Sequence, residues 1–228
     1  MKAKKIIIWV VSAILVVAIA GGAYFAIAAD RADMTVGKYW ASLTKNRETV
    51  ISQTLVTVNG EDISIFGVES AIYLYAALDM PYGDYIDKDI ELLIDRTLLS
   101  QEGRRRGLVV SKEEVDQFVA GQKEILNSLE ADDPTRKAYF DYFESMNMTM
   151  DECYDSEAAR STYANHLLYG KALEDECKKQ GAETPEEKQK VREELVQKLR
   201  ESATIVYNSE NYDRVKKQAV EMTSKSKS

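Results

Sequence analysis

The sequence predicts a mainly α-helical domain with one small two-stranded pairing, preceded by a single transmembrane helix. Three observations lead to this prediction. Helix-capping patterns recur along most of the chain, β-rich segments flank the helical part, and an uncharged apolar run lies near the N-terminus. With 45% hydrophobic and 30% charged residues among 228, the chain has enough apolar content for one globular domain with appendages.

The apolar run at residues 6–29 carries no charge and is long enough, as a helix, to cross a bilayer core of about 30 Å. The basic residues at 1–5 precede it, which places the N-terminus in the cytoplasm and the remaining chain outside. The alternative is a signal peptide cleaved near Ala28, because Ala26 and Ala28 form an A-x-A pattern. We favour a retained anchor, because the run is longer than the about 7–15 apolar residues typical of a signal peptide.

The body of the domain is expected to begin after a juxtamembrane spacer at residues 30–53. A β-rich segment at 54–58 ends at the turn pair Asn59 and Gly60. The one other comparable segment, ATIVY at 203–207, lies near the far end of the chain. We therefore expect these two segments to pair, with helices between them. The domain then spans residues 54–222, followed by a polar, disordered tail at 223–228.

A helical joint at residues 90–118 is the most fully specified part of the sequence. Apolar residues recur at helical spacing over 90–99, and Gly107 provides a left-handed helix end. Arginines at 104–106 precede that glycine, and we interpret them as a solvated helix end more readily than as an anion site. Ser111 and Glu114 then form a capping box that starts the second helix.

Three later capping patterns, at Asp133, Thr149 and Thr184, mark further helix starts. Together these patterns predict helices at residues 65–78, 87–106, 112–129, 134–145, 150–179, 185–202 and 210–222.

The joint also carries a family resemblance. The helix LLIDRTLLSQEGRRRG, followed at once by LVVSKEEVD, resembles the N-terminal chaperone domain of SurA and the matching domain of PrsA-type extracytoplasmic foldases. VTVNGEDIS and MTMDECYDSEAARSTYANHLL extend the resemblance, which covers about residues 54–208. It implies a SurA/trigger-factor-like helical chaperone domain, held here at a bacterial cell membrane.

The chain departs from that family in two respects. PrsA-type proteins are often lipoproteins, but neither Cys153 nor Cys177 lies near the apolar run. Many relatives also carry a parvulin-type peptidyl-prolyl isomerase domain, and no segment of that length is free of helical patterns here. We therefore expect a chaperone module alone and no isomerase activity.

Residue types that support catalysis are scarce. The single histidine, His166, lies on a helix stripe, where a packed or half-exposed histidine is more common than a catalytic one. Cys153 and Cys177 would stand about 36 Å apart on one unbroken helix, so we expect two separate thiols. We expect no metal site, no cofactor and no enzyme activity. The net charge of −8 argues against a nucleic-acid partner.

Aromatic and methionine side chains suggest a surface that adapts to unfolded chains. The hypothesised client-binding residues are Met80, Tyr82, Tyr85, Tyr139, Phe140, Tyr142, Phe143, Met146 and Met148. An equally weighted alternative is that the cluster at 139–143 is buried core. The expected function is a membrane-tethered, extracytoplasmic, ATP-independent chaperone for unfolded secreted or envelope polypeptides. The alternative is a dedicated interaction subunit of an envelope complex.

Overall fold

A computed structural model describes residues 53–68, 86–133 and 147–225, with residues 136, 139–140 and 143–144 between the last two ranges. The predicted membrane segment at 6–29, the spacer and much of the predicted helix at 65–78 lie outside these residues. Among the described helices, none is long and apolar enough to span a bilayer.

The sheet ties the first described residues to the last part of the chain. Strand β1 (Thr54–Val58) lies between β2 (Glu61–Ser64) and β3 (Ile205–Tyr207), and both neighbours run antiparallel to it. Val58 faces Ile205 and Val56 faces Tyr207, so the predicted pairing of 54–58 with 203–207 is confirmed.

The prediction of only two strands was wrong, because it missed β2. Asn59 and Gly60 have φ angles of 51° and 84°, as a tight two-residue hairpin turn requires, and they fold β2 back onto β1. The segment EDIS lacks a clear apolar alternation because its first two residues are exposed at the sheet edge. The turn pair therefore predicts the hairpin better than the composition of the strand does.

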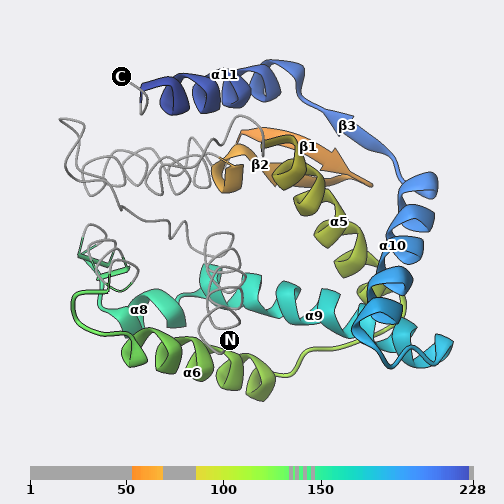
Figure 1. The fold of residues 1–228 in the computed structure, drawn as a ribbon, viewed down its shortest axis with the longest axis horizontal. Coiled ribbons are helices and arrows are strands. Elements are labelled where there is room, and N and C mark those ends of the chain that lie inside the picture. The colour runs from red at the N-terminus through yellow and green to blue at the C-terminus, as the bar shows by residue number, and fades with distance from the viewer. Residues whose placement is uncertain are drawn as a thin grey trace.

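Helix α5 (Ile86–Arg105) lies at the centre of the described fold. It packs on β1, on α9 (Glu157–Gln180) and on α10 (Pro185–Ser202). As Figure 1 shows, the sheet and α11 (Ser209–Lys225) lie on one side, while α6 (Lys112–Ser128), α8 (Met150–Asp155) and α9 lie on the other. α5 and α10 run between the two sides.

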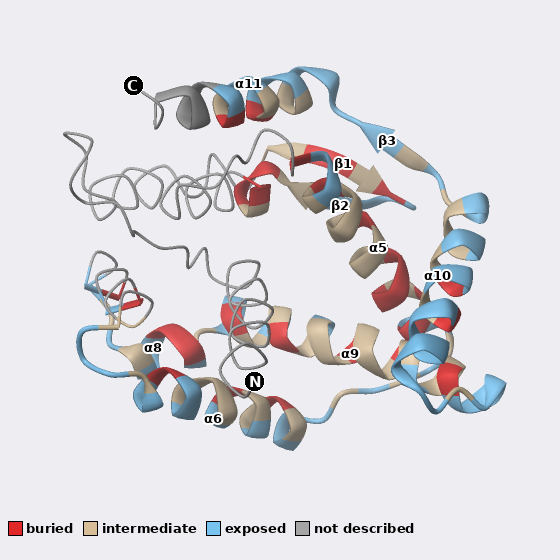
Figure 2. Ribbon diagram, viewed as in Figure 1, coloured by how far each residue is buried: buried red, intermediate tan, exposed pale blue. Residues whose placement is uncertain are grey.

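The core forms where α5 and α11 cover the sheet. Ile90, Ile94 and Leu98 lie one helical turn apart on α5 and are buried against Leu55, Val56 and Val58 of β1 together with Val215 and Ala219 of α11. Figure 2 shows burial along this contact and again where α6, α8 and α9 meet, whereas α10 and β3 are largely exposed.

The joint between α5 and α6 has the predicted form. Gly107 is left-handed, with a φ of 71°, and Leu108 N–H donates to the Gly103 carbonyl across it at 3.0 Å. Glu114 N–H donates to Ser111 Oγ at 3.2 Å, and Ser111 N–H donates to the Glu114 carboxylate at 2.8 Å. The predicted capping box is thus confirmed, as are those at Thr149 and Thr184.

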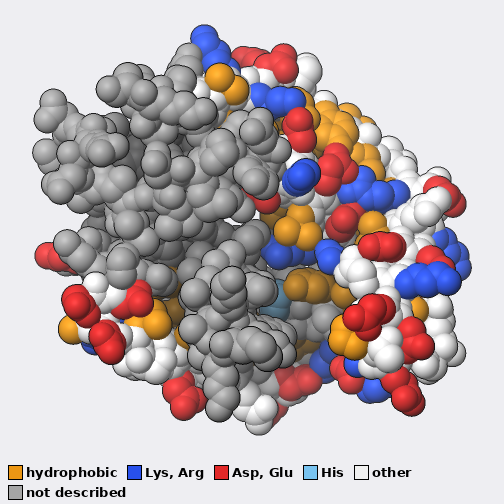
Figure 3. Space-filling model, viewed as in Figure 1, with side chains coloured by type: hydrophobic (Ala, Val, Ile, Leu, Met, Phe, Trp, Pro, Cys, Tyr) orange, Lys and Arg blue, Asp and Glu red, His pale blue; other side chains and the backbone are white. Residues whose placement is uncertain are grey.

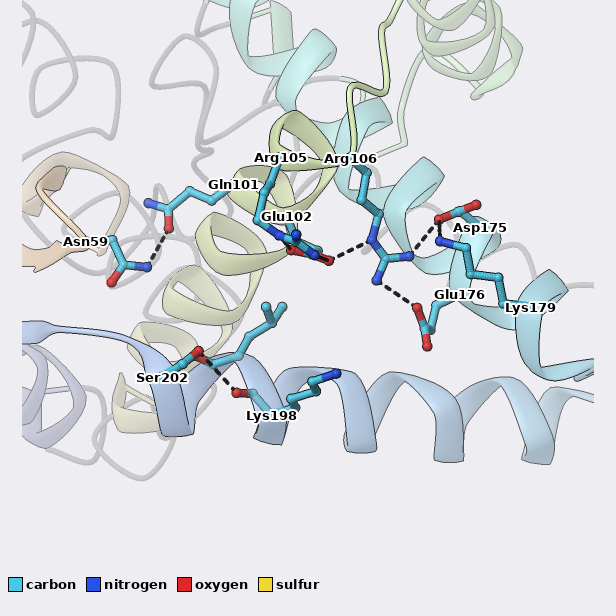
Figure 4. Close-up of polar contacts among 11 residues, drawn as sticks. Asn59, Gln101, Glu102, Arg105, Arg106, Asp175, Glu176, Lys179, Lys198 and Ser202 are labelled. Atoms are coloured by element: carbon cyan, nitrogen blue, oxygen red, sulfur yellow. Dashed lines mark hydrogen bonds and ion pairs between the residues drawn. The ribbon is translucent and has the colours of Figure 1, made fainter.

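The interpretation of the three arginines as a solvated helix end was wrong for Arg106. Its side chain is 13% exposed and donates to Glu102, Asp175 and Glu176 at 2.6–2.7 Å, which links the end of α5 to α9 (Figure 4). Glu102 is 5% exposed. Hydrogen bonds from Arg105 and then from Arg106 lower the pKa of Glu102 to about 2, against the opposing effect of burial.

The predicted helix at 150–179 is two helices, so its expected continuity was also wrong. Ser156 ends α8 and caps α9: its hydroxyl donates to the Cys153 carbonyl at 2.9 Å and accepts from Ala159 N–H at 3.3 Å. A serine cap interrupts a helix without the glycine or proline that marks most breaks. Cys153 and Cys177 are nevertheless two separate, buried thiols, as expected.

Candidate functional site

The structure divides the aromatic cluster proposed for client binding. Tyr139 and Phe143 are 4% and 3% exposed, whereas Phe140 is 39% exposed and lies under the Arg136 guanidinium at 5.0 Å. Met148 is half-buried. The remaining predicted client-binding residues, Met80, Tyr82, Tyr85, Tyr142 and Met146, lie outside the described residues.

Tyr139 and Phe143 belong to a line of rings that stabilises the contact of α6 and α8 with α9. Neighbouring ring centroids along it are 4.8–6.2 Å apart, within the range of favourable aromatic pairs. The line runs through Tyr139, Phe143, Tyr154, Tyr163, Phe118, His166 and Tyr169. Its last two members border a groove that the sequence did not predict.

This groove lies between β2, α5 and α9 and encloses about 240 Å³. Four α5 residues line it at the spacing i, i+3, i+4 and i+7, and four α9 residues do the same, so one face of each helix contributes. The helical residues are Leu93, Arg96, Thr97 and Ser100 of α5 and Thr162, Asn165, His166 and Tyr169 of α9. Residues 61–64, Phe66 and Gly67 complete the wall.

Gly103 brings the two helix faces together. A Cβ atom at this position would lie 2.9 Å from Leu168 Cγ and 3.2 Å from the Leu168 carbonyl oxygen, so α5 and α9 cross in close contact there. Asn165 accepts from Ser100 Oγ through its main-chain carbonyl at 3.2 Å, which adds a polar contact between the same faces. The groove is therefore walled by two helices in a fixed relation.

Arg96 is the most unusual group in the groove. Within the described part of the chain, its buried Nη1 makes no hydrogen bond and its guanidinium has no carboxylate partner. The guanidinium lies 5.9 Å from the centre of the Tyr169 ring, a contact that favours a cation without supplying an acceptor. A buried donor without an acceptor costs about 1–3 kcal/mol, so a ligand that supplies an acceptor to Nη1 would remove this cost.

His166 is recessed in this groove, where it shows as the pale-blue side chain in Figure 3. Burial, followed by the charge of Arg96, lowers the pKa of His166 to about 4. The imidazole is therefore neutral near pH 7, and its ring packs against Phe118 and Tyr169 at 5.3 and 4.8 Å. The expectation of a packed histidine is confirmed.

The two carboxylates on the groove wall are already engaged. Glu61 pairs with Arg104 and accepts from Gln101, while Asp62 accepts from Thr54 and Thr57 at 3.1 and 2.6 Å. Because both are held by other partners, neither compensates Arg96 among the described residues. The groove thus combines an apolar wall, a neutral imidazole and an unpaired cation.

The hydroxyl groups on the groove wall are already engaged in hydrogen bonds within the fold. The hydroxyls of Thr97, Ser100 and Thr162 all donate to main-chain carbonyls of helices, at 2.9–3.2 Å. Within the described residues no group of three or more His, Cys, Asp or Glu side chains could hold a metal ion. The sequence signal for the groove was the polar set at 96, 97 and 100 beside an apolar helix stripe.

Comparison of the chain with protein-family models, with curated proteins and with solved structures found no match.

Proposed function

We propose that this chain is a membrane-tethered, extracytoplasmic, ATP-independent chaperone that holds segments of unfolded secreted or envelope polypeptides. The groove between β2, α5 and α9 carries the proposal, because it offers apolar contact and polar donors in one place. Residues 6–29 serve as the anchor, with the domain outside the cytoplasm. No parvulin domain, nucleotide or metal takes part in this activity.

The size of the groove supports a polypeptide ligand. Pockets for whole small molecules commonly enclose about 300–1,000 Å³, whereas this groove encloses about 240 Å³. It accommodates one or two side chains of a longer ligand that continues across the surface. Exposed Phe140, which lies outside the groove, offers a further adaptable contact for such a ligand.

The second candidate is a dedicated interaction subunit that binds one envelope protein. The fixed walls and single unpaired cation of the groove favour this alternative, because general chaperones use surfaces that re-pack around many ligands. Protection of several unrelated denatured proteins supports the chaperone. Protection of none, with one stable co-purifying envelope protein, supports the interaction subunit.

Filling the groove tests its role directly. In Thr162→Trp an indole occupies the groove, so the full chain in lipid nanodiscs should suppress aggregation of denatured test proteins several-fold less well than wild type. Glu124→Trp places the same side chain on an exposed position of α6 and should leave suppression unchanged. Helix content, measured by circular dichroism, should match wild type in both variants. Full suppression by a folded Thr162→Trp protein would contradict the proposed site.

A further inference from the structure

The outer edge of β2 and Arg96 line the same groove, and neither has a hydrogen-bond partner there among the described residues. We infer that the groove binds an extended polypeptide segment, which pairs with the free edge of β2 and places a carboxylate side chain on Arg96. This inference rests on the proposed function and specifies the form and charge of the bound segment.

The hydrogen bonds around β1 show which way the main-chain N–H and C=O groups of β2 point. Asn59 N–H donates to the Thr204 carbonyl at 2.8 Å, and Asn208 N–H donates to the Leu55 carbonyl at 2.9 Å. Odd-numbered residues of β1 therefore bond towards β3. Because bonding direction alternates along an antiparallel strand, Val56 and Val58 bond towards β2.

The partners of Val56 and Val58 on β2 are Ile63 and Glu61. These two residues therefore use their main-chain groups within the sheet, and the N–H and C=O groups of Asp62 and Ser64 point away from it. No described segment pairs with this outer edge, since β2 is the last strand on its side. An extended peptide can add to such an edge as a further strand.

The charge of the segment follows from Arg96. A guanidinium presents donors in a planar fork that matches a carboxylate, and such charge-assisted pairs are about twice as strong as neutral hydrogen bonds. The buried Nη1 would gain the acceptor that it lacks. Glu61 and Asp62 on the same wall, together with the net charge of −8, disfavour ligands that carry several negative charges. The preferred segment therefore carries one carboxylate among uncharged residues.

Peptide binding separates this inference from the proposed function. The probes are a short fluorescent peptide rich in Val and Thr with one central Glu, its Gln twin, and the Glu peptide with alternate main-chain amides N-methylated. Binding is measured by fluorescence anisotropy with the full chain in nanodiscs. The Glu peptide should bind about ten-fold or more tightly than the Gln twin, because a charged hydrogen bond contributes about 1.5–3 kcal/mol. N-methylation of the Glu peptide should weaken its binding by a similar factor, because it removes main-chain donors needed for strand pairing.

Arg96→Gln should remove the preference for Glu while leaving the affinity for the Gln twin within about two-fold. Arg96→Lys retains the charge without the planar fork and should give an intermediate preference, which keeps the test valid if Arg96→Gln folds poorly. Arg192→Gln, on α10 and away from the groove, is the matched control and should retain the full preference.

Each other outcome counts against a specific statement. A folded Arg96→Gln protein that still prefers Glu overturns the carboxylate site, and unweakened binding of the N-methylated peptide overturns the strand pairing. Absence of peptide binding by a wild-type chain that does suppress aggregation overturns the inference and leaves the proposed function standing. Absence of both activities overturns the two together.

Discussion

At the scale of single residues, burial determines which side chains in the groove carry a charge. His166 lies between Phe118 and Tyr169 and faces Arg96 of α5, with Glu61 and Asp62 of β2 on the opposite wall. Burial and the neighbouring guanidinium both disfavour the imidazolium. The neutral ring serves as a packing surface and leaves Arg96 as the cation that a ligand meets.

The lowered pKa of His166 predicts loss of stability in mild acid. An unfolded histidine takes up a proton near pH 6.5, whereas the folded one does so near pH 4, so its contribution to stability is complete above pH 6.5 and is lost as the pH falls towards 4. The contribution is at most about 3.5 kcal/mol, at about 1.4 kcal/mol for each pKa unit. Chemical unfolding of the full chain in neutral detergent, followed from pH 7.5 to 4, measures it.

His166→Phe keeps an aromatic ring between its two neighbours and removes the titration. Its free energy of unfolding should fall clearly less than that of wild type between pH 6.5 and 4, with the remaining decrease due to carboxylates. An equal decrease in both proteins over this interval would contradict a neutral, half-buried His166.

The residue types of a binding surface were predictable, but their exposure was not. The aromatic cluster at 139–143 was interpreted either as a client-binding surface or as buried core, and the structure buries Tyr139 and Phe143 while exposing Phe140. That division depends on where α8 and α9 pack, which no local pattern encodes. Arg96 could not be singled out either, because the sequence does not show that its buried Nη1 has no acceptor among the described residues.

At the scale of elements, the crossing of α5 and α9 sets the width of the groove. It depends on Gly103, where any side chain would meet Leu168. Alanine usually stabilises a helix by about 1 kcal/mol relative to glycine, but overpacking costs about 1–3 kcal/mol. The close approach to the Leu168 main chain leaves little room for relaxation, so the steric cost should dominate.

Gly103→Ala should therefore lower the free energy of unfolding by about 1–2 kcal/mol. Gly121 lies in the interior of α6 with open space around its Cβ direction, so Gly121→Ala should raise it by up to about 1 kcal/mol. Denaturant unfolding of the two variants in parallel provides the comparison. Equal stabilisation by both substitutions would show that the two helices do not cross closely.

Helix boundaries were largely predictable because their caps are local. The capping boxes at Ser111, Thr149 and Thr184 start α6, α8 and α10 where the sequence placed them. The break at Ser156 was missed because a serine cap interrupts a helix without glycine or proline. The strand β2 was missed because its first two residues are exposed and its composition lacks an apolar alternation, although the turn pair before it is a strong local signal for a hairpin.

At the scale of the whole molecule, the chain closes on itself through the sheet. β1 and β3 come from opposite ends of the described sequence, and their pairing was predicted because no other β-rich segment was available to either. The groove could not be predicted in the same way. It requires the relative placement of β2, α5 and α9, which are far apart in sequence and whose lining residues are individually ordinary.

The outer edge of β2 is the inferred binding site for a polypeptide. The opposite edge of the sheet, β3, is an internal comparison, because the amides of Ile205 and Tyr207 also point away from β1. Peptide binding through β2 should slow amide hydrogen exchange at the β2 edge and leave exchange at the β3 edge unchanged.

Amide hydrogen exchange of the full chain in nanodiscs, with and without the Glu-containing peptide, tests this claim most directly. At a peptide concentration of one hundred times Kd, exchange at Asp62 and Ser64 should slow by up to about 100-fold, while Ile205 and Tyr207 exchange as before. Unchanged exchange at Asp62 and Ser64 under saturating peptide, or protection at Ile205 and Tyr207 instead, would contradict it.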